Sequence, residues 1–103
     1  MKQPFFTVVI PALNEEKYLP NLLESLHTQT WKDFEVIVVD GRSKDKTVDV
    51  AKSFEKKLPA FHVLVSNIAS LPLQRNIGAQ RARGEWLVFV DDEEETVLPV
   101  PEF

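Results

Sequence analysis

Four short apolar segments recur along the 103-residue chain, and they constrain its fold more than any other feature. They are rich in β-branched and aromatic residues and occupy residues 6–10, 34–39, 61–65 and 86–90. Their apolar residues mostly follow one another instead of alternating with polar ones, which is typical of strands covered on both faces, as in a parallel sheet. The segments therefore predict four parallel strands with helices on both sides of the sheet.

Helical spacing of apolar residues fills the three intervals between these segments. In the first interval four leucines recur at i, i+3, i+4 and i+7, and a helix is expected to begin near Pro20, because proline is tolerated only in a first turn. The same spacing over residues 47–58 predicts a second helix. The third is expected to follow an N-cap at Ser70 and to end at Gly84, and its small residues Gly78, Ala79 and Ala82 are expected to permit close packing on the sheet. The order β-α-β-α-β-α-β with right-handed crossovers predicts an open, mostly parallel α/β sheet with helices on both faces.

The chain is expected to form one α/β domain at residues 1–92, followed at residues 93–103 by an acidic loop and a truncated C-terminal segment without a further element. No apolar run is long enough to cross a bilayer, and the first residues lack the apolar core of a signal peptide. The absence of cysteine excludes disulfides, zinc-thiolate sites and thiol nucleophiles, and it agrees with a reducing compartment. A cytoplasmic location is therefore expected.

The net charge of −4 comes from one acidic run, Asp91-Asp92-Glu93-Glu94-Glu95. Without these five residues, the remaining acidic residues fall one short of the 12 lysines and arginines. The basic residues form no stripe along the sequence. A nucleic-acid partner is therefore not expected, because such partners are bound through clustered positive charge.

Polar residues gather in the loops after the predicted strands, where open parallel α/β sheets bind their ligands. Asp40 ends the second apolar segment, and its carboxylate can accept hydrogen bonds from a nucleobase or a ribose hydroxyl. Gly41 follows it and is expected to let the backbone turn sharply. Alternatively, Asp40, Ser43 and Asp45 form a turn and cap the next helix. The two roles are compatible, and the local sequence favours neither.

The acidic run begins directly after the fourth apolar segment, so a carboxylate at Asp91 is expected at this same edge of the sheet. Mg²⁺ and Mn²⁺ prefer one or two carboxylates together with phosphate oxygens. The alternative is a solvated charged loop. Arg75 in the third helix is a candidate phosphate ligand, because its guanidinium offers a planar fork of donors; the alternative is a surface arginine.

Four segments, in this order and spacing, resemble the inverting glycosyltransferases of family 2, whose donor-binding domain has the GT-A fold. The matching segments are V-V-I-P-A-L-N-E-E at residues 8–16, V-I-V-V-D-G-R-S-K-D-K-T at 36–47, Q-R-N-I-G-A-Q-R-A-R-G-E-W at 74–86 and L-V-F-V-D-D at 87–92. Together they span nearly the whole chain. The resemblance implies the nucleotide-sugar-binding half of such an enzyme.

By that resemblance, a UDP- or GDP-sugar is bound by Pro11, Ala12, Glu15, Asp40, Arg75 and Asp91. Asp91 would also open the metal-binding Asp-x-Asp motif, with Mg²⁺ or Mn²⁺ as the cofactor. The sequence departs from that motif, because its third position is Glu93. If the motif is aligned from the end of the fourth apolar segment, its two acidic positions are Asp91 and Glu93. If it is aligned backward from Thr96, they are Glu93 and Glu95. The strand end favours Asp91, and the choice of second carboxylate stays open.

The resemblance also implies what lies outside the chain. The catalytic base and the acceptor site of the family follow the metal motif, so the base is expected beyond Phe103, and the acceptor is unknown. Many family members act beside membranes, which predicts an acceptor at the cytoplasmic face of a membrane. The fourth strand would be an uncovered edge, and such an edge invites a homo-oligomer through pairing with another copy.

Two alternative functions compete with this interpretation. A nucleotidyltransferase-like domain also holds metal and nucleotide at the end of a sheet, but such enzymes carry a glycine-rich basic loop after the first strand, and residues 11–16 contain neither glycine nor a basic pair. The second alternative is a non-catalytic nucleotide-binding or assembly fragment. A dinucleotide-binding oxidoreductase is disfavoured, because no G-x-G-x-x-G follows the first strand.

Overall fold

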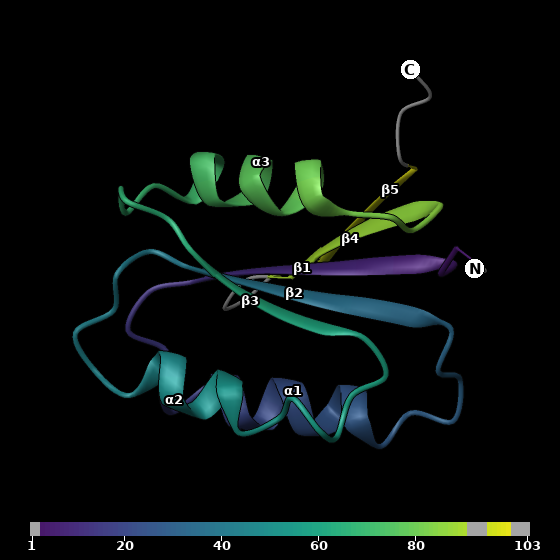
Figure 1. Cartoon of the computed structure of the whole chain (residues 1–103), viewed down its shortest axis with the longest axis horizontal. Coiled ribbons are helices and arrows are strands. Elements are labelled where there is room, and N and C mark those ends of the chain that lie inside the picture. Colours follow the sequence, from purple (N-terminus) through teal and green to yellow (C-terminus); the bar gives the residue numbers. More distant parts are fainter. Residues whose placement is uncertain (1–2, 91–94, 100–103) are drawn as a thin grey trace.

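The computed structural model describes residues 3–90 and the strand at residues 95–99. One open sheet lies between two helical layers, with α3 on one face and α1 and α2 on the other (Figure 1). The predicted element order and mostly parallel sheet are confirmed, and one further strand follows. The elements are β1 (Phe6–Ala12), α1 (Leu19–His27), β2 (Phe34–Asp40), α2 (Thr47–Lys52), β3 (Phe61–Val65), α3 (Leu71–Arg81), β4 (Trp86–Val90) and β5 (Glu95–Pro99).

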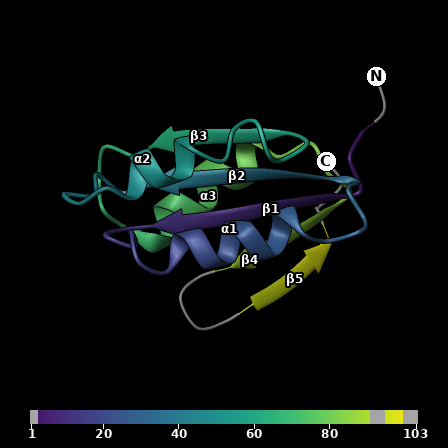
Figure 2. The same cartoon turned by 90° about the horizontal axis from the view of Figure 1, so that it is seen from below.

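The strand order is β3-β2-β1-β4-β5, with β1, β2, β3 and β4 parallel and β5 antiparallel to β4. The expected exposed edge at the fourth strand is therefore wrong, because β4 is paired on both sides and Val88 lies opposite Val97 (Figure 2). The segment that was expected to lack an element holds the β-branched pair Thr96-Val97, which suits a strand. A homo-oligomer formed through the free edge of β4 loses its basis.

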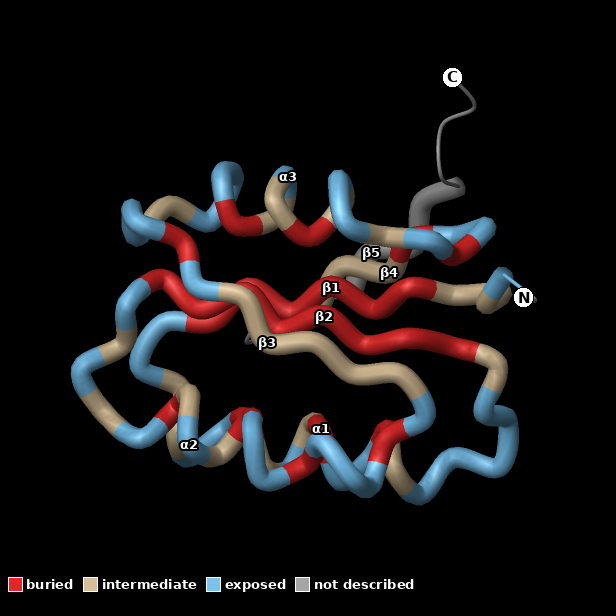
Figure 3. Tube along the Cα trace, in the orientation of Figure 1, coloured by how far each residue is buried: buried red, intermediate tan, exposed pale blue. Residues whose placement is uncertain are grey.

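The two central strands form the core of the molecule. Every residue of β2 is buried, as is every residue of β1 except Phe6 (Figure 3). Val36 and Val38 pack with Leu23 of α1, while Val9 faces Gly78 of α3. Both faces of these strands are covered, which explains why their apolar residues run consecutively.

The second helix is shorter than predicted. α2 ends at Lys52, and turns continue the chain, with Phe54 N donating to Ala51 O at 3.0 Å and Lys57 N donating to Phe54 O at 3.0 Å. Ser53 tightens the helix end, because its N–H and its hydroxyl both bond to Val50 O. Phe54 is still buried, so the apolar spacing predicted which residues are buried and overestimated the helix length.

The third helix starts as predicted but ends early. The Ser70 hydroxyl accepts from Leu73 N at 3.4 Å, which confirms the N-cap. The helix ends at Arg81, so Gly84 is not its terminating glycine. Gly84 instead packs against β1, where an added Cβ would lie 2.6 Å from Thr7 N. The prediction for Gly78 is confirmed, since a Cβ there would lie 2.3 Å from Val9 Cγ1.

The described helices are short relative to a bilayer. None of those within residues 3–90 is long and apolar enough to cross a membrane.

Candidate functional site

The carboxyl ends of β1 and β2 lie side by side, because their parallel register pairs Ala12 with Asp40. β4 points the same way, with Phe89 beside Val9. The carboxyl ends of these three strands therefore lie at one edge of the sheet. We call residues 13–18 after β1 and 41–46 after β2 the loop pair.

Polar contacts tie the two members of the loop pair together. Asn14 N donates to Ser43 Oγ at 2.8 Å, and Lys44 N donates back to Asn14 Oδ1 at 2.8 Å. Glu15 N donates to Thr47 Oγ1 at 2.8 Å, at the start of α2. The loop pair is thus one connected structure, in which each loop supplies acceptors for the other's backbone.

Asp40 is buried beneath this connection, with 1% of its surface exposed. Its Oδ2 accepts from Ser43 N at 2.8 Å and its Oδ1 from Ser43 Oγ at 2.5 Å. The turn expected as one of the two alternatives for Asp40 is therefore present. A carboxylate has lone pairs beyond these two bonds, so contact with a base or ribose stays a prediction.

Two residues of the loop pair have a left-handed backbone conformation, with positive φ. Among residues 3–90 the non-glycine residues with positive φ are Asn14, at 55°, and Arg42, at 68°. Gly41 has no positive φ, so it does not supply the left-handed conformation of this turn, which the next residue adopts instead. Non-glycine residues in this region are uncommon and cluster at functional sites.

Asp45 is the second carboxylate of the β2–α2 loop. It accepts from the Thr47 hydroxyl, from Thr47 N at 2.9 Å and from Glu16 N at 3.3 Å. The Thr47 hydroxyl is the largest cause that lowers the pKa of Asp45, ahead of the backbone N–H groups, and partial desolvation opposes it. Asp45 therefore favours its ionised form and bonds to Thr47, the first residue of α2, whereas the N-cap position itself is Lys46, without a side-chain cap bond.

The structure brings several of the predicted site residues to this edge. Pro11 and Ala12 are buried at the end of β1, and Glu15 is half-buried in the loop after it. Arg75 is half-buried on α3, directly after Gln74, whose side chain contacts Ala12 O. Asp91 and Glu93 lie outside the described residues.

A small polar pocket of about 200 Å³ opens beside the loop pair. Its lining includes Glu15 and Asp45 together with Asn14, Glu16, Lys17 and Tyr18. Within the part of the chain that the structure describes, no three histidine, aspartate or glutamate side chains form a metal-binding group. A site built from three such side chains would therefore need residues from outside this part of the chain.

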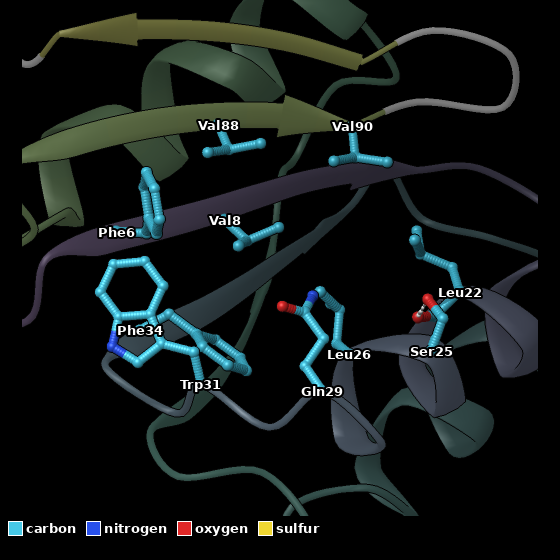
Figure 4. Close-up of a pocket in the computed structure, with 10 residues that line it drawn as sticks. All are labelled: Phe6, Val8, Leu22, Ser25, Leu26, Gln29, Trp31, Phe34, Val88 and Val90. Carbon is cyan, nitrogen blue, oxygen red and sulfur yellow. Dashed lines mark hydrogen bonds between the residues drawn. The ribbon is translucent and has the colours of Figure 1, made fainter.

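A larger pocket of about 280 Å³ lies elsewhere, between α1 and the face of β1 and β4 (Figure 4). Phe6, Val8, Val88 and Val90 line it from the sheet. None of its lining residues is charged, and it shares none with the predicted site. An apolar pocket of this kind does not suit a diphosphate, so the loop pair is the better candidate site.

Sequence reasoning missed the side chains that join the two loops. Asn14 and Thr47 bond to residues 29–32 positions away, and such pairings depend on which loops are neighbours in space. The turn from Asp40 to Ser43 had been expected, as one of the two alternatives for this loop.

The family model for glycosyl transferase family 2 matches residues 7–96, and this range includes β1 from its second residue on, the loop pair, α3 and β4. The chain belongs to glycosyl transferase family 2. Putative glycosyltransferase EpsH of Bacillus subtilis is 33% identical over 94 residues, which are 91% of this chain and 27% of EpsH.

Solved structures agree with this family 2 assignment. A crystal structure of TarS from Staphylococcus aureus in complex with UDP-GlcNAc superposes with a TM-score of 0.80 and 36% identity, covering 84% of this chain and 26% of that one. Mannosyltransferase PcManGT from Pyrobaculum calidifontis, in complex with GDP-Man and Mn²⁺, gives a TM-score of 0.78 and 25% identity, covering 88% and 28%. The family 2 domain described here therefore has a GT-A-like fold and spans under a third of each of these relatives.

Proposed function

We propose that this family 2 chain binds the nucleotide-sugar donor of an inverting glycosyltransferase, together with Mg²⁺ or Mn²⁺. The observation that carries the proposal is the loop pair, a hydrogen-bonded polar rim at the carboxyl ends of β1 and β2. In open α/β sheets this is the edge where ligands bind. The similarity to structures holding UDP-GlcNAc or GDP-Man and Mn²⁺ supports the same ligand class, a UDP- or GDP-sugar.

Each predicted residue has a role that its chemistry supports. Pro11, Ala12 and Glu15 would line the nucleotide pocket, since they end β1 and begin the loop pair. Asp40 would accept a hydrogen bond from the base or the ribose through a lone pair not used by Ser43. Arg75 would offer its planar donors to a phosphate.

Metal binding is assigned to Asp91 with Glu93, both outside the described residues. Support comes from β4, which ends at Val90 on the same edge as β1 and β2. Carboxylates with phosphate oxygens are the ligands that Mg²⁺ and Mn²⁺ prefer. The bound cation would offset the negative charge that develops on the departing nucleoside diphosphate.

The transfer step also needs a general base, which we do not assign to any described residue. That base would take the proton of an acceptor hydroxyl, whose oxygen attacks the anomeric carbon from the face opposite the diphosphate and inverts it. The acceptor is unknown, and a membrane-proximal acceptor and a cytoplasmic location remain predictions. Residues 3–90 would contribute donor binding and orientation.

Calorimetric titration with UDP and with GDP, each with and without Mn²⁺, tests the proposal. We expect one of the two to bind, and binding to weaken on Mn²⁺ removal and in Asp91→Asn. The matched control is Asp49→Asn, the same change at an exposed position on α2. Failure of both nucleotides to bind with Mn²⁺ would contradict the proposal. If nucleotide affinity changes neither on Mn²⁺ removal nor in Asp91→Asn, the result would instead support the non-catalytic nucleotide-binding alternative.

A further inference from the structure

A glutamine is completely buried beneath the carboxyl ends of β1 and β2, the edge of the sheet at which we propose donor binding. Gln74 of α3 has no exposed surface, and its Nε2 donates to Ala12 O at 3.1 Å and to Val39 O at 2.9 Å. Both partners are carbonyl oxygens, which only accept hydrogen bonds, so the amide orientation is determined by its surroundings. The side chain therefore bridges the last residues of β1 and β2 from the α3 side of the sheet.

The other end of the amide points at the turn after β2. Gln74 Oε1 is buried without a hydrogen-bond partner, and a Cβ built on Gly41 would lie 2.6 Å from it. Gly41 thus leaves the space that this amide oxygen occupies. Gly41 N also donates to Ala12 O at 2.9 Å, so Ala12 O joins β1, the turn and Gln74.

Core stability alone explains this arrangement poorly. A buried amide oxygen without a partner is unfavourable, and an unbranched apolar side chain of similar length would fill the space without that penalty. What such a side chain lacks is the pair of donors that hold two strand ends together. Gln74 therefore sets the relative position of Ala12, which directly precedes the loop pair, and Val39, which is separated from it only by Asp40.

We propose that Gln74 is a positioning residue of the donor site: its amide bridges Ala12 O and Val39 O and holds the loop pair in its nucleotide-binding arrangement. This inference rests on the proposed function, from which it takes the identity of the ligand, a UDP- or GDP-sugar. The Gln74 amide nitrogen already bonds to two backbone carbonyls, so we assign Gln74 no nucleotide contact of its own. Its contacts reach across 62 and 35 positions of sequence, so it connects α3 to both central strands.

Two substitutions at Gln74 separate hydrogen bonding from packing. Gln74→Met keeps the length and removes both donors. Gln74→Glu keeps the shape but sets a carboxylate against two carbonyl oxygens, so it can donate only when protonated, and burial raises the pKa of such a carboxyl. Gln80→Met and Gln80→Glu make the same changes at an exposed position of the same helix.

UDP with Mn²⁺ is the probe, and its affinity is compared with that of the parent chain at each pH. We expect Gln74→Met to weaken binding roughly tenfold with a nearly unchanged unfolding midpoint, and the Gln80 variants to stay within about twofold. Gln74→Glu should approach parental affinity near pH ~5 and lose it near pH ~8. The parent, measured over the same range, controls for Asp40, Asp45 and the phosphates of the probe.

The competing outcomes are distinct. Parental affinity in Gln74→Met overturns the inference, and so does an unfolded Gln74→Met together with a Gln74→Glu chain that does not recover at low pH, because packing alone then explains the residue. If the parent binds neither UDP nor GDP, the proposed function fails, and amide hydrogen exchange decides the inference. Faster exchange at Gly41 and Glu15 in Gln74→Met supports it, and unchanged exchange overturns it.

Discussion

Strand β2 has a buried carboxylate at each end, and the two differ in what they hold together. Glu35 at the amino end and Asp40 at the carboxyl end are both 1% exposed. Asp40 bonds to Ser43, three residues on, and shapes one turn. Glu35 Oε2 instead accepts from Thr7 Oγ1 at 2.7 Å and from Arg83 N at 2.6 Å, which joins β1 and the α3–β4 connection.

The difference shows that burial and charge do not by themselves distinguish Asp40, the proposed binding residue, from Glu35, a structural one. Both carboxylates are equally buried, and the partners of Glu35 are farther away along the sequence than Ser43 is from Asp40. They include Arg83, whose Nε lies 3.6 Å from Glu35 Oε1, and His62, whose Nε2 lies 3.9 Å from it. What separates them is the strand end, because the loops that bind ligands follow the carboxyl ends of parallel strands. Substitutions at the Glu35 end should therefore change stability, and those at the Asp40 end should change nucleotide affinity.

The largest expected effect on stability is at the amino ends of β1 and β2, where Gly84 packs against β1. Gly84→Ala places a Cβ 2.6 Å from Thr7 N and 2.7 Å from Phe6 C, and backbone atoms of a paired strand cannot move aside easily. We expect a loss of about 3 kcal/mol in the free energy of unfolding, measured by urea denaturation, without a change in the UDP affinity of the folded protein. A loss below ~0.5 kcal/mol would show that this end of β1 is compliant.

The next largest effects are expected when each of the two carboxylates is replaced by the corresponding amide. Glu35→Gln weakens a buried acceptor of two hydrogen bonds and should cost about 2 kcal/mol of unfolding free energy while leaving UDP affinity unchanged. Asp40→Asn should cost less than about 1 kcal/mol, because the Ser43 hydroxyl can rotate to accept from the new amide, yet weaken UDP binding roughly tenfold. Equal effects of both variants on affinity would contradict the contrast between the strand ends.

A smaller effect is expected from the glycine at the carboxyl end. Gly41→Ala brings a Cβ within 2.6 Å of Gln74 Oε1, and this neighbour is a side chain that can move, so the unfolding free energy should fall by only about 1 kcal/mol. Moving Gln74 disturbs the loop pair, so calorimetry should show weaker UDP binding. In a Gln74→Ala background the added methyl has room, and Gly41→Ala should then have no further effect on affinity. An undiminished further loss would place its cause outside Gln74.

The sequence allowed much of this molecule to be predicted, and the limits are physical. The four parallel strands and the place of Asp40 follow from local runs of apolar residues, whose burial on both faces needs no knowledge of partners. The roles of Gly41 and Gln74 depend on contacts between α3 and two strands, which no local pattern encodes. β5 was missed because it begins at Glu95, the last residue of an acidic run that was interpreted as a loop. The roles of Asp91 and Glu93 stay predictions.

The smallest effect concerns Asp45, whose lowered pKa makes loop stability depend on pH. The Thr47 hydroxyl holds the pKa of the folded state below the ordinary value of 3.8, so the stabilisation is present above 3.8 and is lost as the pH falls through the lower folded value. Urea denaturation of the parent between pH ~5 and pH ~2.5 should show this loss, and Asp45→Asn should flatten the slope. An NMR titration should find the Asp45 pKa raised in Thr47→Val. Identical slopes in the parent and Asp45→Asn would mean that the contacts of Asp45 persist in the unfolded chain or contribute nothing, and the loop pair would then be held by its neutral hydrogen bonds alone.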